Sequence, residues 1–342
     1  MRLKELSRRT EVYVGIIVIF LAIFIELRSG YFFTSNNFLD LMRAMIIPGM
    51  FGLLEYIVIV SGGVDVSFPS LAALSMYSSI IILKAIDFQG SIVLAYALCC
   101  SIGIVLGLLN GLIISRYRFP VLIVTLGTSS IFIGILFGFL GAHEIPVLPA
   151  PIQSLAKQSL FSFYHEKSGI TGSLPSVFLV FVGLTILVWF VMNKTVLGRS
   201  IYAIGGDINS SERIGINVRA VHVFIYAFAG FIAGMVGMTR VALIDSCHPN
   251  TFTGMDMTVI AAVILGGTRA SGGFGSITGV MLATLLLVMV NNSLQLMGIA
   301  TYWQKFFLGM IIVLGTSISA YQANRKRMRL SVDISDEQEA QI

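Results

Sequence analysis

Residues 50–74 read MFGLLEYIVIVSGGVDVSFPSLAAL, in which two apolar stretches flank the short segment SGGVDV at 61–66. The apolar stretches extend over 44–60 and 66–84, and a lipid core of about 30 Å requires about 17–25 such residues per helix. The whole chain is 56% hydrophobic and 11% charged, whereas soluble domains carry roughly 25% charged residues. The stretch therefore predicts two membrane helices joined by a tight turn, or one interrupted unit, in an all-α polytopic membrane protein.

The same hydrophobic pattern continues on both sides of this pair and predicts about ten transmembrane helices. The predicted spans are 12–27, 44–60, 66–84, 90–115, 119–141, 174–192, 220–244, 257–268, 275–297 and 302–320. The segment at 257–268 is short and followed by glycines, so a re-entrant or broken helix is an alternative there. Residues 1–320 form one transmembrane domain in this interpretation.

The basic residues predict the orientation, because cytoplasmic loops of membrane proteins are enriched in Lys and Arg. With about ten spans and both termini in the cytoplasm, 15 of the 22 basic residues lie on the cytoplasmic side. No small-residue cleavage site follows the first apolar run, so we expect this span to be retained. The basic residues act as topology signals, and no nucleic-acid partner is expected.

Three segments are expected outside the lipid. Residues 142–173 form an outer loop, and residues 321–342 form a cytoplasmic tail whose polar composition is typical of disorder. The inner loop 193–219 contains DINSSERIG at 207–215, which predicts a short helix with Asp207 or Asn209 as its N-cap and Gly215 at its end. Because this loop also carries several isoleucines, it is predicted to dock onto another subunit.

Polar side chains inside the predicted spans are candidates for a translocation path or gate. They are Glu55, Asp65, Asn110, Thr125, Asn291 and Asn292. A charge at the centre of a span costs about 2.5–3.5 kcal/mol, so the carboxyl of Glu55 should face protein or a water-filled path. A protonated Glu55 at a helix contact is the alternative. Asp65 is predicted either to cap the next helix or to contact solute.

Motifs of enzymatic chemistry are missing from the sequence. There is no G-x-x-x-x-G-K-[ST] and no H-E-x-x-H, and the four histidines are far apart. We therefore expect no catalytic residue, metal or cofactor, and no enzyme activity in this chain. Gly103, Gly107 and Gly111 place three notches on one helix face, which predicts a close helix contact within the chain or between subunits.

Several motifs resemble one family. SGGVDVSFPSLAAL at 61–74 resembles the G-G-[IV]-D-[LV]-S signature of bacterial ABC importer permeases of the ribose and simple-sugar type, within the broader branched-chain amino acid and ribose permease family. GLLNGLIISRYRFPVLIVTLGT at 107–128 and MDMTVIAAVILGGTRASGGFGSITG at 255–279 are similar to further signatures. TVLGRSIYAIGG at 195–206, with IGINV at 214–218, is similar to the loop of that family that faces the ATPase. Phe68-Pro69-Ser70 departs from the usual V-G-S, but proline suits the first turn of a helix.

The resemblance implies a non-enzymatic permease subunit that moves a monosaccharide or related small polar solute by alternating access. Its implied partners are a second permease subunit, a cytoplasmic ATP-binding subunit and a periplasmic or lipid-anchored sugar-binding protein, in the bacterial cytoplasmic membrane. The ATPase-coupling residues that it implies are Gly198, Arg199, Tyr202, Gly205, Gly206, Asp207, Gly215, Ile216 and Asn217. The alternatives are a permease for branched-chain amino acids or nucleosides, and a proton-coupled secondary transporter that uses Glu55.

Overall fold

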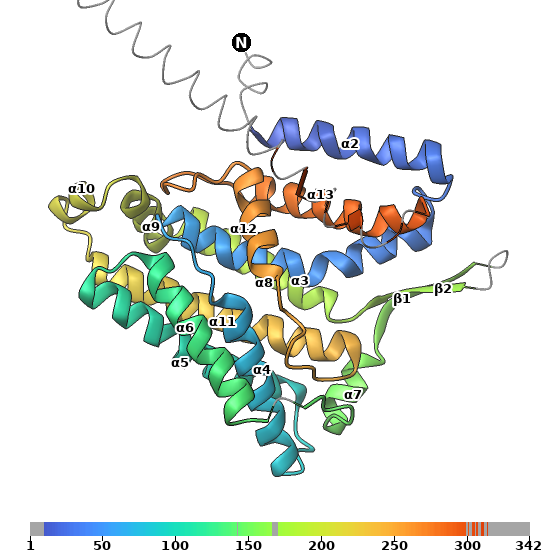
Figure 1. The fold of residues 1–342 in the computed structure, drawn as a ribbon, viewed down its shortest axis with the longest axis horizontal. Coiled ribbons are helices and arrows are strands. Elements are labelled where there is room, and N and C mark those ends of the chain that lie inside the picture. The colour runs from blue at the N-terminus through green and yellow to red at the C-terminus, as the bar shows by residue number, and fades with distance from the viewer. Residues whose placement is uncertain are drawn as a thin grey trace, which may run out of the picture.

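The structure is a computed structural model, and it is mostly helical (Figure 1). It describes residues 10–141, 143–165, 170–298 and 300, followed by 303, 304, 306, 309, 310 and 313. The predicted cytoplasmic tail at 321–342 and most of the predicted span at 302–320 lie outside the described residues.

Seven helices correspond to predicted spans. They are α2 (Thr10–Ser29), α3 (Ser35–Val60), α4 (Phe68–Ala85), α5 (Ile92–Tyr117), α6 (Val121–Gly138), α8 (Phe178–Lys194) and α11 (Val218–Ile244). Helix α3 begins nine residues before its predicted start. Helix α13 (Ile277–Leu296) has 20 residues and also corresponds to a predicted span, 275–297. Shorter helices are α7 (Ala150–Ala156), α9 (Val196–Gly206), α10 (Ile208–Arg213) and α12 (Met255–Leu265). Each turn of an α-helix advances about 5.4 Å, so the longest of these helices can cross a lipid core.

Among the described residues, six helices are long and apolar enough to cross a membrane, or seven if the bent pair α8 and α9 counts as one span. The protein is therefore a multi-pass membrane protein, whereas the count of about ten and the orientation of the termini stay predictions. The predicted segment 257–268 corresponds to α12, which has 11 residues. At about 1.5 Å per residue, it is too short to span alone, in agreement with the broken-helix alternative.

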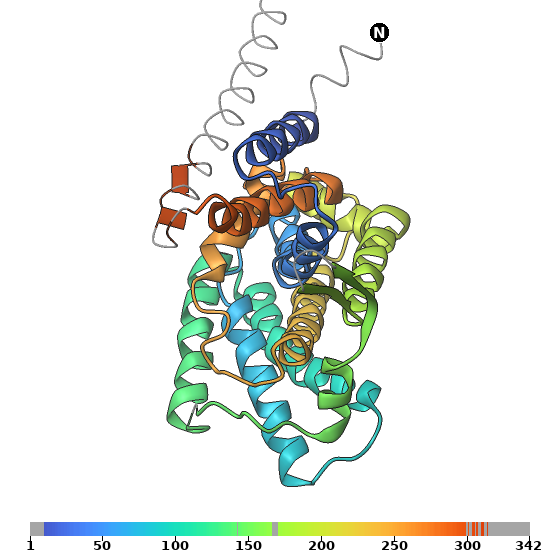
Figure 2. The same ribbon diagram turned by 90° about the vertical axis from the view of Figure 1, so that its right-hand side faces the viewer.

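Helix α3 lies at the centre of the molecule, between α13 on one side and α11 on the other (Figures 1 and 2). Its second half, from Met50 to Val60, is buried throughout. Helices α5 and α6 instead expose large apolar side chains, among them Leu109, Leu112, Ile123 and Leu126. Because such a surface is unfavourable in water, this face is suited to lipid or to another subunit.

The three glycines of α5 form a contact within the chain. A side-chain carbon on Gly103 or Gly107 would overlap backbone atoms of α11, the carbonyl oxygen of Gly230 or that of Tyr226. Helices α5 and α11 share the most extensive helix contact among the described elements. The predicted close contact is confirmed, and it lies within the chain.

The predicted outer loop has more structure than expected. It contains α7 and an antiparallel hairpin of β1 (Ser159–His165) and β2 (Ile170–Pro175). The prediction of an all-α fold is therefore wrong for this segment. Its two strands, of seven and six residues, pair with each other in an antiparallel hairpin. The hairpin lies at the opposite end of the molecule from α10 (Figure 1). Ile145 exchanges backbone hydrogen bonds of 2.9 and 3.0 Å with Cys247, which ties the loop to the end of α11.

Candidate functional site: a buried polar cluster next to the coupling segment

The segment between α3 and α4 is buried inside the protein. The chain turns at Gly62, whose φ of +93° favours glycine. Asp65 is 1% exposed, and its Oδ1 accepts hydrogen bonds of 2.6 Å from the backbone N–H and from the hydroxyl of Ser67. Ser67, not Asp65, is the N-cap residue of α4, and Pro69 lies in the first turn of that helix. Asp65 therefore fixes the start of α4 through its hydrogen bonds to Ser67, which is two residues further along the chain.

Four of the six predicted path residues meet in this region. The backbone N–H of Asp65 donates to Glu55 Oε1 at 3.1 Å, and Asn110 Nδ2 donates to the Ser67 hydroxyl at 2.9 Å. The backbone N–H of Val66 donates to the hydroxyl of Thr125 at 3.2 Å. We call Glu55, Asp65, Ser67, Asn110, Thr125 and Tyr226 the buried polar cluster. It joins α3, α5, α6 and α11 through the start of α4.

Three atoms of the buried polar cluster have no hydrogen-bond partner among the described residues. They are Glu55 Oε2, Asn110 Oδ1 and the hydroxyl of Tyr226. Tyr226 interacts electrostatically with both Asp65 and Glu55, and its hydroxyl lies next to Gly63. Buried polar atoms normally have a partner, so the cluster has spare capacity to bind a polar group or a proton.

The two other path candidates lie elsewhere. Asn291 and Asn292 are on α13 and half-buried. In the described part of the chain, Asn291 accepts a hydrogen bond from Gln304 through its backbone oxygen, at 3.1 Å. Neither asparagine has a hydrogen bond to the buried polar cluster among the described residues, so the structure does not join them to the other four candidates.

The predicted coupling loop is two helices. Helix α9 follows α8 at a bend of 71°, and the side chain of Thr195 caps it by accepting from the N–H of Gly198 at 3.1 Å. Helix α10 is the predicted short helix, and Asp207 caps it by accepting from the N–H of Ser210 at 2.9 Å. The prediction of a short helix at 207–215 is confirmed, whereas the residues of α9 were predicted to be part of an irregular loop.

The implied coupling residues take different places on these helices. Gly198 and Gly205 are buried, Tyr202 and Ile216 are half-buried, and Arg199, Gly206, Asp207, Gly215 and Asn217 are exposed. Gly215 ends the α10 turn with a φ of +87°, and Asn217 caps α11 by accepting from the N–H of Ala220 at 3.0 Å. The exposed members are therefore accessible to a partner, and the buried members attach the segment to the core.

Helix α9 is attached to the end of α3 by close backbone contacts. A side-chain carbon on Gly205 would overlap the carbonyl oxygen of Val60 and would lie 2.6 Å from the backbone nitrogen of Gly273. The N–H of Gly273 donates to that same Val60 oxygen at 2.9 Å. The hydroxyl of Tyr202 bonds to the hydroxyl of Tyr56 and donates to the Gly275 carbonyl at 3.2 Å. We call these contacts of Tyr56, Val60, Tyr202, Gly205 and the 273–275 segment the α3–α9 joint.

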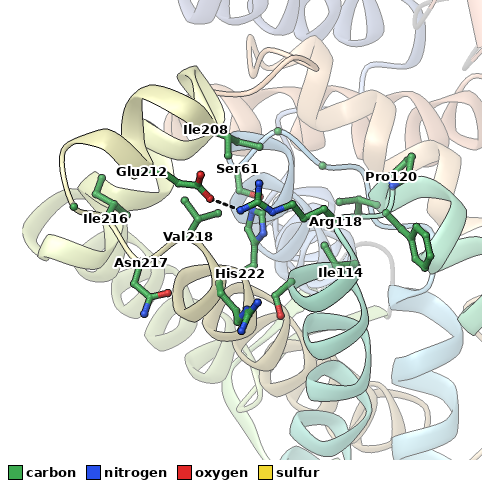
Figure 3. Close-up of a pocket in the computed structure, with 17 residues that line it drawn as sticks. Ser61, Ile114, Arg118, Pro120, Ile208, Glu212, Ile216, Asn217, Val218 and His222 are labelled. Carbon is green, nitrogen blue, oxygen red and sulfur yellow. Dashed lines mark hydrogen bonds and ion pairs between the residues drawn. The ribbon is translucent and has the colours of Figure 1, made fainter.

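A cavity of about 690 Å³ opens beside the joint (Figure 3). The residues that line it come from the ends of α3 and α5, the start of α6, and the α10–α11 region; they include Ser61, Gly62, Gly63, Arg118, Glu212 and His222. Arg118 donates to Glu212 at 2.7 Å across it. Gly63 lines the cavity, and a side-chain carbon at this position would lie 3.1 Å from the hydroxyl of Tyr226, so the cavity is close to the buried polar cluster.

Tyr56 and Tyr226 were not predicted as site residues. Tyrosine is common in membrane spans, and neither position lies in a motif quoted for the family. The one available signal is that a tyrosine hydroxyl in a fully apolar segment needs a partner. This requirement predicts that each tyrosine hydroxyl forms a hydrogen bond, but it does not identify the residue that forms the bond with it.

The long apolar helices define a multi-pass membrane protein. Residues 37–315 match the family model described as the branched-chain amino acid transport system permease component. Since this match covers most of the chain, the protein belongs to that family.

Similar proteins include several sugar import permeases. The chain is 27% identical to the ribose import permease protein RbsC of Escherichia coli K12 over 85% of this chain and 87% of that one. It is 30% identical to RbsC of Bacillus subtilis, over 86% and 88% of the two chains. It is 29% identical to the D-allose transport system permease protein AlsC of Escherichia coli, over 89% of each. No solved structure shows a significant match to the chain.

Proposed function

We propose that the protein is the membrane-spanning subunit of an ATP-driven importer for a monosaccharide or related small polar solute, in the bacterial cytoplasmic membrane. Membership of the permease family and similarity to permeases named for ribose, fructose, D-allose and L-arabinose support this proposal. ATP hydrolysis takes place on a separate cytoplasmic subunit. Two permease subunits form the path, and a periplasmic or lipid-anchored sugar-binding protein delivers the solute.

The α3–α9 joint is the observation that carries the mechanism. Its position between an exposed segment and the central helix supports a role in transmission. The exposed residues of α9 and α10, such as Arg199 and Asp207, contact the ATP-binding subunit. Because Gly205 and Val60 touch through backbone atoms, α9 cannot shift toward α3 without moving it. Movement caused by ATP therefore reaches the end of α3 and the buried loop at 61–67.

The buried polar cluster is the next element in this sequence of movements. Gly62 lies against both Gly205 and the 271–272 segment, and Asp65 follows three residues later. A displacement of the loop changes the hydrogen bonds that join Glu55, Asn110 and Thr125. The cavity at Gly63 and Arg118 lies on the cytoplasmic side in this proposal, and it is where the solute leaves.

Uptake by reconstituted protein tests the proposal. The purified chain is placed in proteoliposomes with the ATP-binding subunit and binding protein that copurify with it. We expect ATP-dependent uptake of labelled ribose, allose, fructose or arabinose that leucine does not compete with. Competition by leucine would instead support the branched-chain amino acid alternative. Uptake by the chain alone, driven by a pH gradient, would overturn the proposed role of ATP.

Charge reversal tests the coupling segment separately. Arg199→Glu and Asp207→Lys should reduce solute uptake by at least about tenfold while ATP hydrolysis by the assembled complex continues, because these exposed side chains face the partner. Lys84→Glu, at the far end of α4, is the matched control and should transport as the wild type does. Unchanged uptake in both loop variants would remove the α9–α10 segment from the mechanism.

A further inference from the structure

The buried polar cluster contains two carboxyl groups next to each other. Glu55 is 0% exposed and Asp65 is 1% exposed, and the backbone N–H of Asp65 donates to Glu55 Oε1. The two side chains repel each other electrostatically when both are ionised. Among the described residues, neither carboxyl forms an ion pair with a Lys, Arg or His side chain. The cluster would therefore carry two uncompensated negative charges if both groups were ionised.

The surroundings of the two carboxyl groups differ. Asp65 Oδ1 accepts two short hydrogen bonds from Ser67, and it lies at the start of α4. The N-terminus of a helix carries a partial positive charge, which favours an anion there. Glu55 accepts a single hydrogen bond at Oε1, and its Oε2 has no partner among the described residues. The negative charge is therefore better accommodated on Asp65 than on Glu55.

The elements around the pair carry other titratable groups, but none of these forms an ion pair with Glu55 or Asp65 in the part of the chain that the structure describes. Tyr226 of α11 is close enough to interact electrostatically with both carboxyl groups. Its phenol group is uncharged, so it does not compensate a negative charge. The elements packed on α3 and on the 61–67 loop also carry Arg219, His222 and Arg240 (α11), Arg199 and Tyr202 (α9), Lys194 (α8), Asp256 (α12), Tyr77 and Lys84 (α4), and Tyr96, Cys99, Cys100, Arg116 and Tyr117 (α5). In the described part of the chain, none of these side chains forms a hydrogen bond or ion pair with Glu55 or Asp65.

We propose that Glu55 binds a proton at Oε2, so that the buried polar cluster carries one negative charge, on Asp65. Burying an ionised carboxylate without a partner is unfavourable because the charge loses its hydration, whereas the neutral acid avoids that loss. Protonation also turns Oε2 from an acceptor into a donor. Asn110 Oδ1 and the oxygen of Tyr226, both without partners among the described residues, are acceptors within the same cluster. The proton therefore removes one of the two negative charges and gives the cluster one additional hydrogen-bond donor.

Infrared spectroscopy of the purified full-length protein tests this proposal without any transport assay, so its outcome does not depend on the proposed function. Exposed carboxyl groups have pKa values of about 4 and are ionised in neutral buffer. A protonated Glu55 gives a carbonyl stretching band that ionised groups lack. We expect this band in the wild type at about pH 7.5, well above those values, and its complete loss in Glu55→Gln, which keeps the Oε1 acceptor. Asp40→Asn, an exposed position on the same helix, should retain the band.

Three results would overturn the proposal. They are a wild-type spectrum without the band, a band that persists in Glu55→Gln, and a band that appears only when sodium is replaced by a large organic cation. The third result would mean that a metal cation, not a proton, neutralises the cluster. If Glu55→Gln cannot be purified, wild-type protein labelled with ¹³C at the glutamate carboxyl provides the same test. Glu55 is the one fully buried glutamate among the described residues, so its band alone should remain at neutral pH and shift with the label.

Discussion

Replacing Gly205 by alanine should break the α3–α9 joint. The new methyl group would overlap the Val60 carbonyl oxygen and lie 2.6 Å from the nitrogen of Gly273, about 1 Å inside the optimal separation of nonbonded atoms. Both obstacles are backbone atoms, so no side chain can rotate away. Overpacking of this kind costs about 1–3 kcal/mol, and loss of the Gly273-to-Val60 hydrogen bond adds about 1 kcal/mol. The total is about 2–4 kcal/mol, which lowers the equilibrium constant for forming the joint roughly thirty-fold or more.

The matched control is the neighbouring position. A methyl group on Gly206 meets nothing within 4 Å, so Gly206→Ala should leave the joint unchanged. Both variants are assembled with the ATP-binding subunit in proteoliposomes, and ATP hydrolysis and solute uptake are measured on the same samples. We expect Gly205→Ala to hydrolyse ATP while its uptake falls roughly thirty-fold or more, in proportion to the equilibrium constant for forming the joint. Wild-type uptake by Gly205→Ala would refute the argument that backbone contact transmits the movement.

Three further predictions test individual contacts. Tyr202→Phe removes two hydroxyl contacts and should lower the free energy of unfolding by about 1–2 kcal/mol. Tyr117→Phe changes an exposed residue and should leave the free energy of unfolding unchanged. Equal melting temperatures of the two variants would contradict this prediction. Gly107→Ala inserts a methyl group into the α5–α11 contact and should cost about 1–3 kcal/mol or prevent folding. Gly127→Ala, which meets nothing within 4 Å, is its control in the same denaturation assay, and similar losses would show that α5 can move away. Glu212→Gln breaks an ion pair with Arg118, and the side chains of Arg118 and Glu212 are 74% and 37% exposed. The loss in the free energy of unfolding should therefore stay below about 1 kcal/mol and vanish at high salt. A larger loss that does not depend on salt would show that the pair is more than a surface contact.

The features that sequence predicted best are local ones. The apolar runs located α2, α3, α4, α5, α6, α8 and α11 to within a few residues, except that α3 begins nine residues before its predicted start. The N-cap role of Asp207 followed from the preference of Asp for the start of a helix. The spacing of Gly103 and Gly107 predicted a close contact because residues four apart share a helix face. Each of these inferences needs information from only a few neighbouring residues.

The buried polar cluster was predictable only as a set of candidates. Asn110 and Thr125 are polar residues in apolar spans, but their hydrogen bonds to Ser67 and Val66 join positions 43 and 59 residues apart. Those partners depend on how α5 and α6 pack around α3, which no local pattern specifies. Asn291 has the same sequence signature as Asn110 and lies outside the cluster.

Helix α9 and the outer hairpin show a second limit. The segment of α9 follows α8 after a single residue, so its sharp bend could not be distinguished from an irregular loop. The hairpin of β1 and β2 forms within a segment whose prolines and polar residues favoured loop. In both cases packing against distant residues decides the conformation, as in the contact of Gly205 with Val60.

The backbone character of the α3–α9 joint has a consequence for the conditions under which it works. At Val60, Gly205 and Gly273 the contact consists of amide and carbonyl groups, which neither titrate nor carry a net charge at any physiological pH. Ionic strength screens exposed charges but has little effect on close packing. The stiffness of this joint should therefore remain constant while the acidity and salt content of the surrounding solution vary, in contrast to the nearby pair of Arg118 and Glu212.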